Sequence, residues 1–89
     1  MAKNPASLLQ FPCSYPLKVV GRNVNAFHAS VSAIIEKHVA EGENVTYTTR
    51  VSSHDTYMSI TATFIATNQQ QLTAIYEELS RNELVLITL

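Results

Sequence analysis

The feature that most constrains the fold is a strand-like run over residues 57–66 that leads directly into a helical pattern over residues 67–81. Alternation in the run separates two faces, with Met58, Ile60, Ala62 and Phe64 inward and Ser59, Thr61, Thr63 and Ile65 outward. The helical pattern begins with Thr67 and Gln70 at the spacing of a capping box, and Glu77 and Arg81 form an i,i+4 pair. Its apolar stripe consists of Leu72, Ile75, Tyr76 and Leu79. A strand followed by a helix that can cover it predicts a layered α+β domain.

The remaining patterns supply four more elements. Residues 15–21 alternate as a strand that has Pro16 at its start, and residues 25–40 predict a helix capped by Asn23 or Asn25 and ended by Gly42. Residues 45–52 alternate as a half-buried strand, which the polar loop 53–56 joins to the next strand as a hairpin. Residues 83–89 form a last strand. The order β-α-β-β-α-β predicts a ferredoxin-like fold, an antiparallel sheet of four strands with both helices on one face.

The chain of 89 residues has room for one domain. We expect residues 1–7 to be a mobile N-terminal tail, because they offer little to bury and Pro5 would break an early helix. Residues 8–89 then form the single domain, and Leu8, Leu9 and Phe11 are predicted to dock on it as a short turn.

Composition excludes several classes of protein. Six Lys and Arg against seven Asp and Glu leave no basic excess, so we predict no nucleic-acid partner. Cys13 is the single cysteine, which excludes an intramolecular disulfide and predicts an inert, partly buried thiol. No apolar run approaches the roughly 20 residues of a membrane span, and the first residues lack the apolar core of a signal peptide. We therefore expect a cytoplasmic protein without a membrane partner.

Several segments together carry a family resemblance: Phe11-Pro12, Lys18-Val19-Val20-Gly21, Ser52-Ser53 with Tyr57 and Ser59, and Ile75-Tyr76-Glu77-Glu78-Leu79 before a terminal apolar strand. From about residue 8 to residue 89 the chain resembles the YbeD-like family of small uncharacterised bacterial proteins. The resemblance implies a domain similar to the ACT regulatory domains of amino-acid metabolism, a bacterial cytoplasmic origin and no established activity. Leu86 departs from the family, whose last strand often carries a basic residue there.

The turn into the first helix is the strongest candidate for ligand or anion binding. Gly21, Arg22, Asn23 and Asn25 combine a helix N-terminus, whose backbone amides are free, with a bidentate donor. Acylphosphatases share this topology and bind phosphate at the same turn, so an acylphosphatase-like enzyme is the alternative function. The match to those enzymes fails at His28, which stands where they carry a phosphate-binding arginine. The match to ACT ligand sites is weaker than the match to the YbeD-like family, because the turn has no carboxylate.

No cofactor or metal is predicted from the remaining reactive side chains. His28, His38 and His54 are spaced by 10 and 16 residues without a second set of ligands. The carboxylates are scattered over helix surfaces and loops, so a paired general acid and base is not expected, and neither is a catalytic residue. His38 is expected at the edge of the core and His54 in solvent.

The open face of the sheet and the last strand form the second candidate surface. Lys18, Arg50 and Thr61 should point away from the helices, and Val85 and Ile87 belong to a last strand that is apolar on both faces. RNA-recognition modules share the topology but stack bases on aromatic residues of the two central strands, and those positions hold Thr, Ser and Lys here. An apolar edge strand favours a homodimer. In the alternative, Leu8, Leu9 and Phe11 fold back and cover the strand within one molecule.

Together these patterns predict a non-enzymatic regulatory or interaction module that binds a small ligand or a protein partner. The identities of the ligand, the partner and the pathway do not follow from the sequence.

Overall fold

Six elements follow one another in the predicted order. A computed structural model describes residues 10–89, and its elements are β1 (Cys13–Arg22), α1 (Asn25–His38), β2 (Thr46–Val51), β3 (Tyr57–Ala66), α2 (Gln69–Ser80) and β4 (Val85–Thr88). The predicted tail over residues 1–7, together with Leu8 and Leu9, lies outside the described residues. Phe11 is half-buried and packs against the core, as expected for a docked segment.

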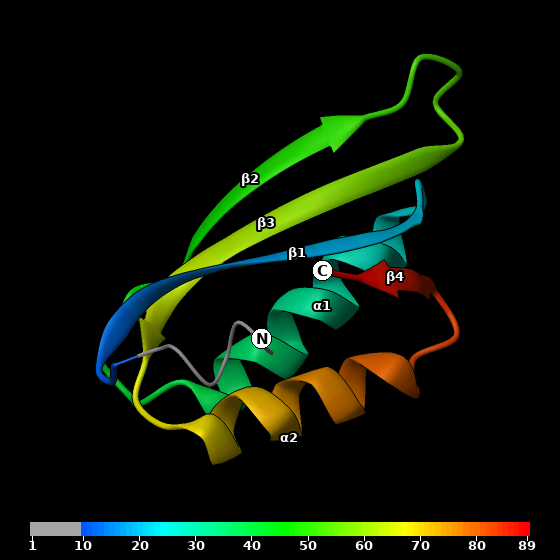
Figure 1. Cartoon of the computed structure of the whole chain (residues 1–89). Helices are drawn as coiled ribbons and strands as arrows, with labels where there is room; N and C mark the ends of the chain where they lie inside the picture. The colour runs from blue at the N-terminus through cyan, green and yellow to red at the C-terminus, as the bar shows by residue number, and fades with distance from the viewer. Residues whose placement is uncertain (1–9) are drawn as a thin grey trace, which may run out of the picture.

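The four strands form one antiparallel sheet in the order β2-β3-β1-β4. Both helices lie on the same side of this sheet, so the molecule has two layers and its other sheet face is open (Figure 1). The central pair, β1 and β3, is in register along its whole length, from Cys13 opposite Ala66 to Arg22 opposite Tyr57. The predicted ferredoxin-like fold is therefore confirmed.

The core fills the space between the layers. The alternation predicted for β3 is confirmed, since Ile60, Ala62 and Phe64 are buried and Ile65 on the opposite face is exposed. The sheet and the two helices contribute the following fully or almost fully buried residues: Leu17, Val19, Ile60, Ala62, Phe64 and Ala66 from the sheet, Phe27, Val31, Ile34 and Ile35 from α1, and Leu72, Ile75 and Leu79 from α2. Burial of apolar side chains at helical and alternating spacings is what holds the two layers together.

Strand β2 differs from the prediction. Only Tyr47 within it is half-buried, and its other five residues are exposed. The reason is its position at the edge of the sheet, where the hairpin that it forms with β3 extends past the helices (Figure 1). An alternating pattern on an edge strand does not require a covered face.

Strand β1 is longer than predicted and contains Pro16 in its interior. Lys18 exchanges two backbone hydrogen bonds with Leu89, at 3.2 and 2.7 Å, so its amide faces the β4 side of the strand. Pro16 lies two residues earlier and faces the same side, beyond the end of β4. Its missing N–H therefore costs no hydrogen bond of the sheet.

The predicted helix caps are wrong in their residues. Val24 occupies the N-cap of α1 without a side-chain bond, and neither Asn23 nor Asn25 caps it. Asn68, not Thr67, caps α2, because its side-chain oxygen accepts from the Gln71 amide at 2.8 Å. Gln71 in turn accepts from the Thr67 amide at 2.8 Å.

The end of α1 also differs from the prediction. The helix ends at His38 and Val39 continues in an extended conformation. Gly42 has a positive φ of 91°, but it lies in a separate turn, in which the Glu43 amide donates to the Ala40 carbonyl at 3.0 Å. The glycine therefore serves the turn that leads toward β2.

The two faces of β3 predict contrasting effects of truncation. Ile60→Ala or Phe64→Ala should lower the free energy of unfolding by about 2–5 kcal/mol, because each leaves a cavity in the core. Thr61→Ala on the open face should cost less than about 1 kcal/mol. Denaturant titration of the three variants measures this, and a larger loss for Thr61→Ala than for Ile60→Ala would show that the two faces are reversed.

Candidate functional site

The turn predicted to bind a ligand joins β1 to α1, and its glycine has a packing role. Gly21 is buried, and a Cβ atom there would overlap both the ring of Phe27 and the carbonyl oxygen of Leu84. Phe27 is itself fully buried. A residue without a side chain is therefore needed so that the first turn of α1 can approach the sheet.

Asn23 connects this turn to the β2–β3 hairpin loop. Its side-chain amide donates to the carbonyl of Asp55 at 3.0 Å, and its backbone amide donates to the carbonyl of Thr56 at 3.0 Å. Asp55 has a positive φ of 59°, which an Asp tolerates better than most residues. Two donors of Asn23 are thus used within the fold and hold the loop against the start of α1.

Arg22 and Asn25 are exposed beside this contact. The Arg22 amide donates to the Leu84 carbonyl at 3.4 Å, and its side chain forms no ion pair with any residue from 10 to 89. His28 lies in the first turn of α1, and the centre of its ring is 5.3 Å from the centre of the Tyr47 ring. Ligand binding at Gly21, Arg22, Asn23 and Asn25 remains a prediction, and two of the four residues have structural roles.

The open face of the sheet brings Lys18, Arg50 and Thr61 together. Lys18 lies opposite Thr61, which lies opposite Thr48, while Arg50 lies opposite Ser59, which lies opposite Val20. Each of these rows of cross-strand neighbours is one rung of the sheet, and the two rungs are adjacent on the open face. They border a hollow of about 260 Å³, lined by Lys18, Thr48, Thr49, Arg50, Ser59 and Thr61. Two cations and three hydroxyl groups of the open face therefore surround one shallow space.

Val85 and Ile87 of the last strand point to different faces of the sheet, although they are two residues apart. Ile87 lies opposite Val20 and is 53% exposed, which places it on the open side of the sheet. Val85 packs against the core, because the register shifts by one residue between Val20 and Gly21. Val85 and Ile87 therefore point to different sides of the sheet, and an interaction surface that includes both residues stays a prediction.

Beside β4 lies a second hollow, of about 390 Å³, lined by Tyr76, Ser80, Val85, Leu86, Ile87 and Thr88. Leu86 and Leu89 are 48% and 64% exposed, and β4 is an edge strand. Phe11 does not cover it, since Phe11 precedes the end of β1 that pairs with Ala66, whereas β4 pairs with Val19–Gly21. The outer edge of β4 therefore carries exposed apolar side chains.

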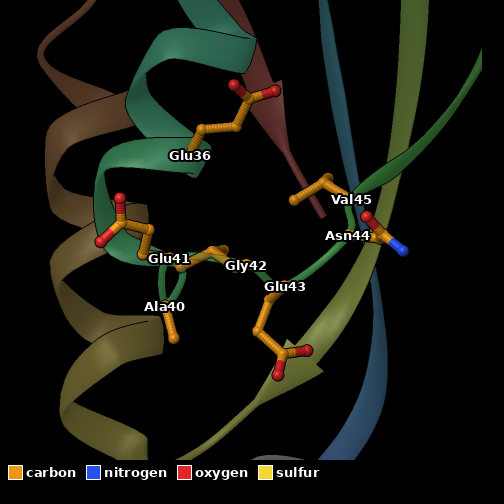
Figure 2. Close-up of a pocket in the computed structure, with 8 residues that line it drawn as sticks. Glu36, Ala40, Glu41, Gly42, Glu43, Asn44 and Val45 are labelled. Carbon is orange, nitrogen blue, oxygen red and sulfur yellow. The ribbon is translucent and has the colours of Figure 1, made fainter.

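An acidic hollow after α1 was not expected from the sequence. Its volume is about 340 Å³, and Figure 2 shows its lining, formed by Glu36, Val39, Ala40, Glu41, Gly42, Glu43, Asn44 and Val45. The three carboxylates point in different directions (Figure 2). Glu36 accepts a hydrogen bond from the Tyr47 hydroxyl at 2.7 Å. Within residues 10–89 no three His, Cys, Asp or Glu side chains are grouped so that they could hold a metal ion. Burial and the Glu36 contact raise the pKa of Tyr47, so this link between β2 and α1 remains protonated.

Glu78 joins the two helices. Its carboxylate contacts the ammonium group of Lys37, and its other oxygen lies 2.9 Å from Nε2 of His38. The Lys37 and His38 hydrogen bonds hold the pKa of Glu78 below its ordinary value of 4.5. The expected position of His38 at the edge of the core is confirmed, whereas the predicted Glu77–Arg81 ion pair is absent from the described residues.

The depressed pKa of Glu78 predicts a dependence of stability on pH. The ionised carboxylate stabilises the folded state above its ordinary pKa, and this contribution is lost as the pH falls through the lower folded-state value. Glu78→Gln should therefore lose less stability than the wild type between about pH 6 and about pH 3. Urea titrations at both pH values measure the difference.

Glu77→Gln is the matched control for this experiment, because Glu77 is exposed and forms no ion pair within residues 10–89. It should keep the pH dependence of the wild type. Equal pH dependence in Glu78→Gln and the wild type would contradict a stabilising interaction at Glu78.

The fold is similar to that of the ACT domain from GTP pyrophosphokinase of Chlorobium tepidum. The crystal structure of that domain superposes with a TM-score of 0.66 at 17% identity, covering 88% of this chain and 96% of that one. Its solution structure gives a TM-score of 0.65 at 16% identity, covering 90% and 86%. The chain is thus an ACT-like α+β domain in its fold.

Residues 6–89 match the family described as "Protein of unknown function (DUF493)", and the chain belongs to that family. It is 39% identical over 87 residues to a UPF0250 protein of Neisseria gonorrhoeae, covering 98% of this chain and 96% of the relative. It is 31% identical over 83 residues to a UPF0250 protein of Nitrosomonas europaea, covering 93% and 95%. The predicted resemblance to the YbeD-like family of uncharacterised bacterial proteins is therefore confirmed. Neither helix within residues 10–89 is long and apolar enough to cross a membrane.

Proposed function

We propose that this protein is a non-enzymatic regulatory or interaction module of the cytoplasm that binds a ligand or partner and associates with a second copy of itself. The observation that carries the proposal is the outer edge of β4, which is apolar, exposed and flanked by a hollow against α2. Monomeric proteins normally blunt such an edge with charge, proline or a cover. Within β4 itself, residues 85–88 include neither a charged residue nor a proline.

A second copy is the occupant that best fits this edge. Two β4 strands related by a two-fold axis would pair antiparallel, which would extend the sheet from four strands to eight and satisfy the outward amides and carbonyls. Leu86 and Ile87 of each copy would then lose exposed apolar surface.

The contacts of the polar side chains also support binding over catalysis. Glu36 bonds Tyr47, Glu78 bonds Lys37 and His38, and Asn23 bonds the hairpin loop, so each of these groups connects two elements of the fold. Tyr15 and Tyr76 likewise bond each other through their hydroxyl groups at 2.7 Å. No serine, threonine or cysteine lies beside a base among these contacts, and the raised pKa of Tyr47 keeps its hydroxyl, which bonds Glu36, protonated.

Sedimentation velocity at micromolar concentration tests the association. The full chain should sediment as a dimer, and Ile87→Lys should shift it to a monomer, because a charge on an edge strand opposes pairing and the two-fold axis would bring two like charges onto neighbouring strands. Ile65→Lys is the matched control, since Ile65 is also exposed but lies on β3, away from β4. A monomeric wild type that self-associates only after deletion of residues 1–11 would show instead that the N-terminal segment covers β4.

Incubation with acetyl phosphate tests the non-enzymatic assignment. We expect no hydrolysis above that in buffer, because Asn23 is held by the hairpin loop and His28 packs against Tyr47. Clear hydrolysis that Arg22→Ala abolishes would establish the acylphosphatase-like alternative.

A further inference from the structure

Charge is divided between the two layers of the molecule. All seven acidic residues lie on helices or loops, namely Glu36, Glu41, Glu43, Asp55, Glu77, Glu78 and Glu83. The strands carry no acidic residue but hold Lys18, Arg22 and Arg50, which are three of the six basic residues. The sheet is therefore basic although the chain as a whole has a net charge of −1.

Two of these cations point to the open face and border the same hollow. Lys18 stands between Leu17 and Val19, which are fully buried on the helix side, so its own side chain points the other way. Arg50 lies on β2, on the far side of β3, one rung away from Lys18. Strands about 4.8 Å apart place the two Cα atoms roughly 10–12 Å apart, a separation that two long side chains can span above Ser59 and Thr61.

The donors around this hollow have no partner among residues 10–89. The ion pairs of the described residues involve Lys37 and His38 but not Lys18 or Arg50. The hydroxyl groups of Thr48, Ser59 and Thr61 likewise make no hydrogen bond to another described side chain or backbone group, in contrast to those of Thr67 and Ser80. A guanidinium, an ammonium and three hydroxyl groups are thus all available to one acceptor.

This donor set is suited to a tetrahedral oxyanion. Arginine donates a pair of parallel hydrogen bonds to phosphate, lysine adds a compact charge, and hydroxyl groups fill the remaining acceptor positions. A long polyanion fits less well, because it needs successive cations along its path. Arg22 is the one other basic residue on the strands, and it lies at the end of β1.

A smaller hollow of about 170 Å³ adjoins the hollow bordered by Lys18 and Arg50, and the two hollows share Arg50 and Ser59. Val20 and Tyr57 also line it, and Tyr57 is 43% exposed. An apolar or aromatic group attached to the bound oxyanion would lie there, against the tyrosine ring.

We propose that the open sheet face binds a small phosphate-bearing ligand, with the phosphate held by Lys18, Arg50, Ser59 and Thr61 and an apolar or aromatic body against Val20 and Tyr57. The inference rests on the ligand-binding role proposed above and names the class of ligand and its site. It requires no catalytic step and no residue of the β1–α1 turn.

Titration with methylphosphonate and phenylphosphonate, followed by two-dimensional amide NMR, tests the site. Both probes should cause saturable shifts centred on Lys18, Thr48, Arg50, Ser59 and Thr61, with sodium chloride of equal ionic strength as the reference. Phenylphosphonate should bind about two- to tenfold more tightly, because it also contacts Tyr57. Lys18→Gln and Arg50→Gln should each weaken both probes about tenfold, through the loss of one charge-assisted contact.

Two further variants separate the site from general charge effects. Tyr57→Ala should abolish the preference for phenylphosphonate and leave methylphosphonate binding unchanged. Arg81→Gln removes an exposed cation at the end of α2 and should leave both affinities unchanged. The amide spectrum of each variant shows whether it is folded.

The inference is overturned if the probes cause no saturable shift, or if the shifts persist in Lys18→Gln and Arg50→Gln. Shifts centred on Asn23 and Asn25 would place the anion at the β1–α1 turn and also overturn it. Sedimentation and the acetyl phosphate assay report on β4 and on catalysis, so a failure here is distinguishable from a failure of the proposed function.

Discussion

The antiparallel pairing of β1 with β3 is the constraint on which the rest of the structure depends. It joins ten residues of the first quarter of the chain to ten residues beyond the midpoint. Cys13 lies opposite Ala66 at one end of the pairing, and Arg22 lies opposite Tyr57 at the other. A shift of one residue would exchange the faces of one strand, so that Lys18 would enter the core and Leu17 would leave it. Because Leu17, Val19, Ile60 and Phe64 are all buried on one side, the helices have one sheet face to cover and the hydroxyl groups and cations occupy the other.

The sequence predicts the inward and outward faces of β1 and β3 because both strands are central and their apolar and polar residues largely alternate. The sequence predicts the burial of β2 less well, because an edge strand that extends past the helices can alternate without burying a face. The predicted cap of α2, Thr67, lies one residue before the observed cap, Asn68, because the segment from Thr67 to Gln71 is polar throughout. Two pairs within it, Thr67 with Gln70 and Asn68 with Gln71, have the spacing of a capping box, and only the backbone conformation decides between them.

The candidate surfaces could be predicted only in part, for a related reason. Alternation places Lys18, Arg50 and Thr61 on the open face, but their convergence on one hollow depends on how three strands are aligned. The one-residue shift opposite Gly21 turns Val85 inward, and no property of residues 83–89 indicates it. Contacts over long sequence separations, such as Asn23 with Asp55 or Lys37 with Glu78, depend on the packed arrangement and leave no local pattern.

The two proposed binding events would share β1. The backbone of Lys18 is bonded to Leu89 just beyond β4, whereas its side chain borders the hollow on the open face. Val20 similarly pairs with Ile87 and lines the adjoining hollow. A second copy that pairs with β4 would therefore lie one strand away from the strand that positions both residues. If association strengthens ligand binding, thermodynamic linkage requires the ligand to strengthen association by the same factor. A domain of this size could in this way couple a ligand to its association state without a catalytic group, which is what a regulatory module requires.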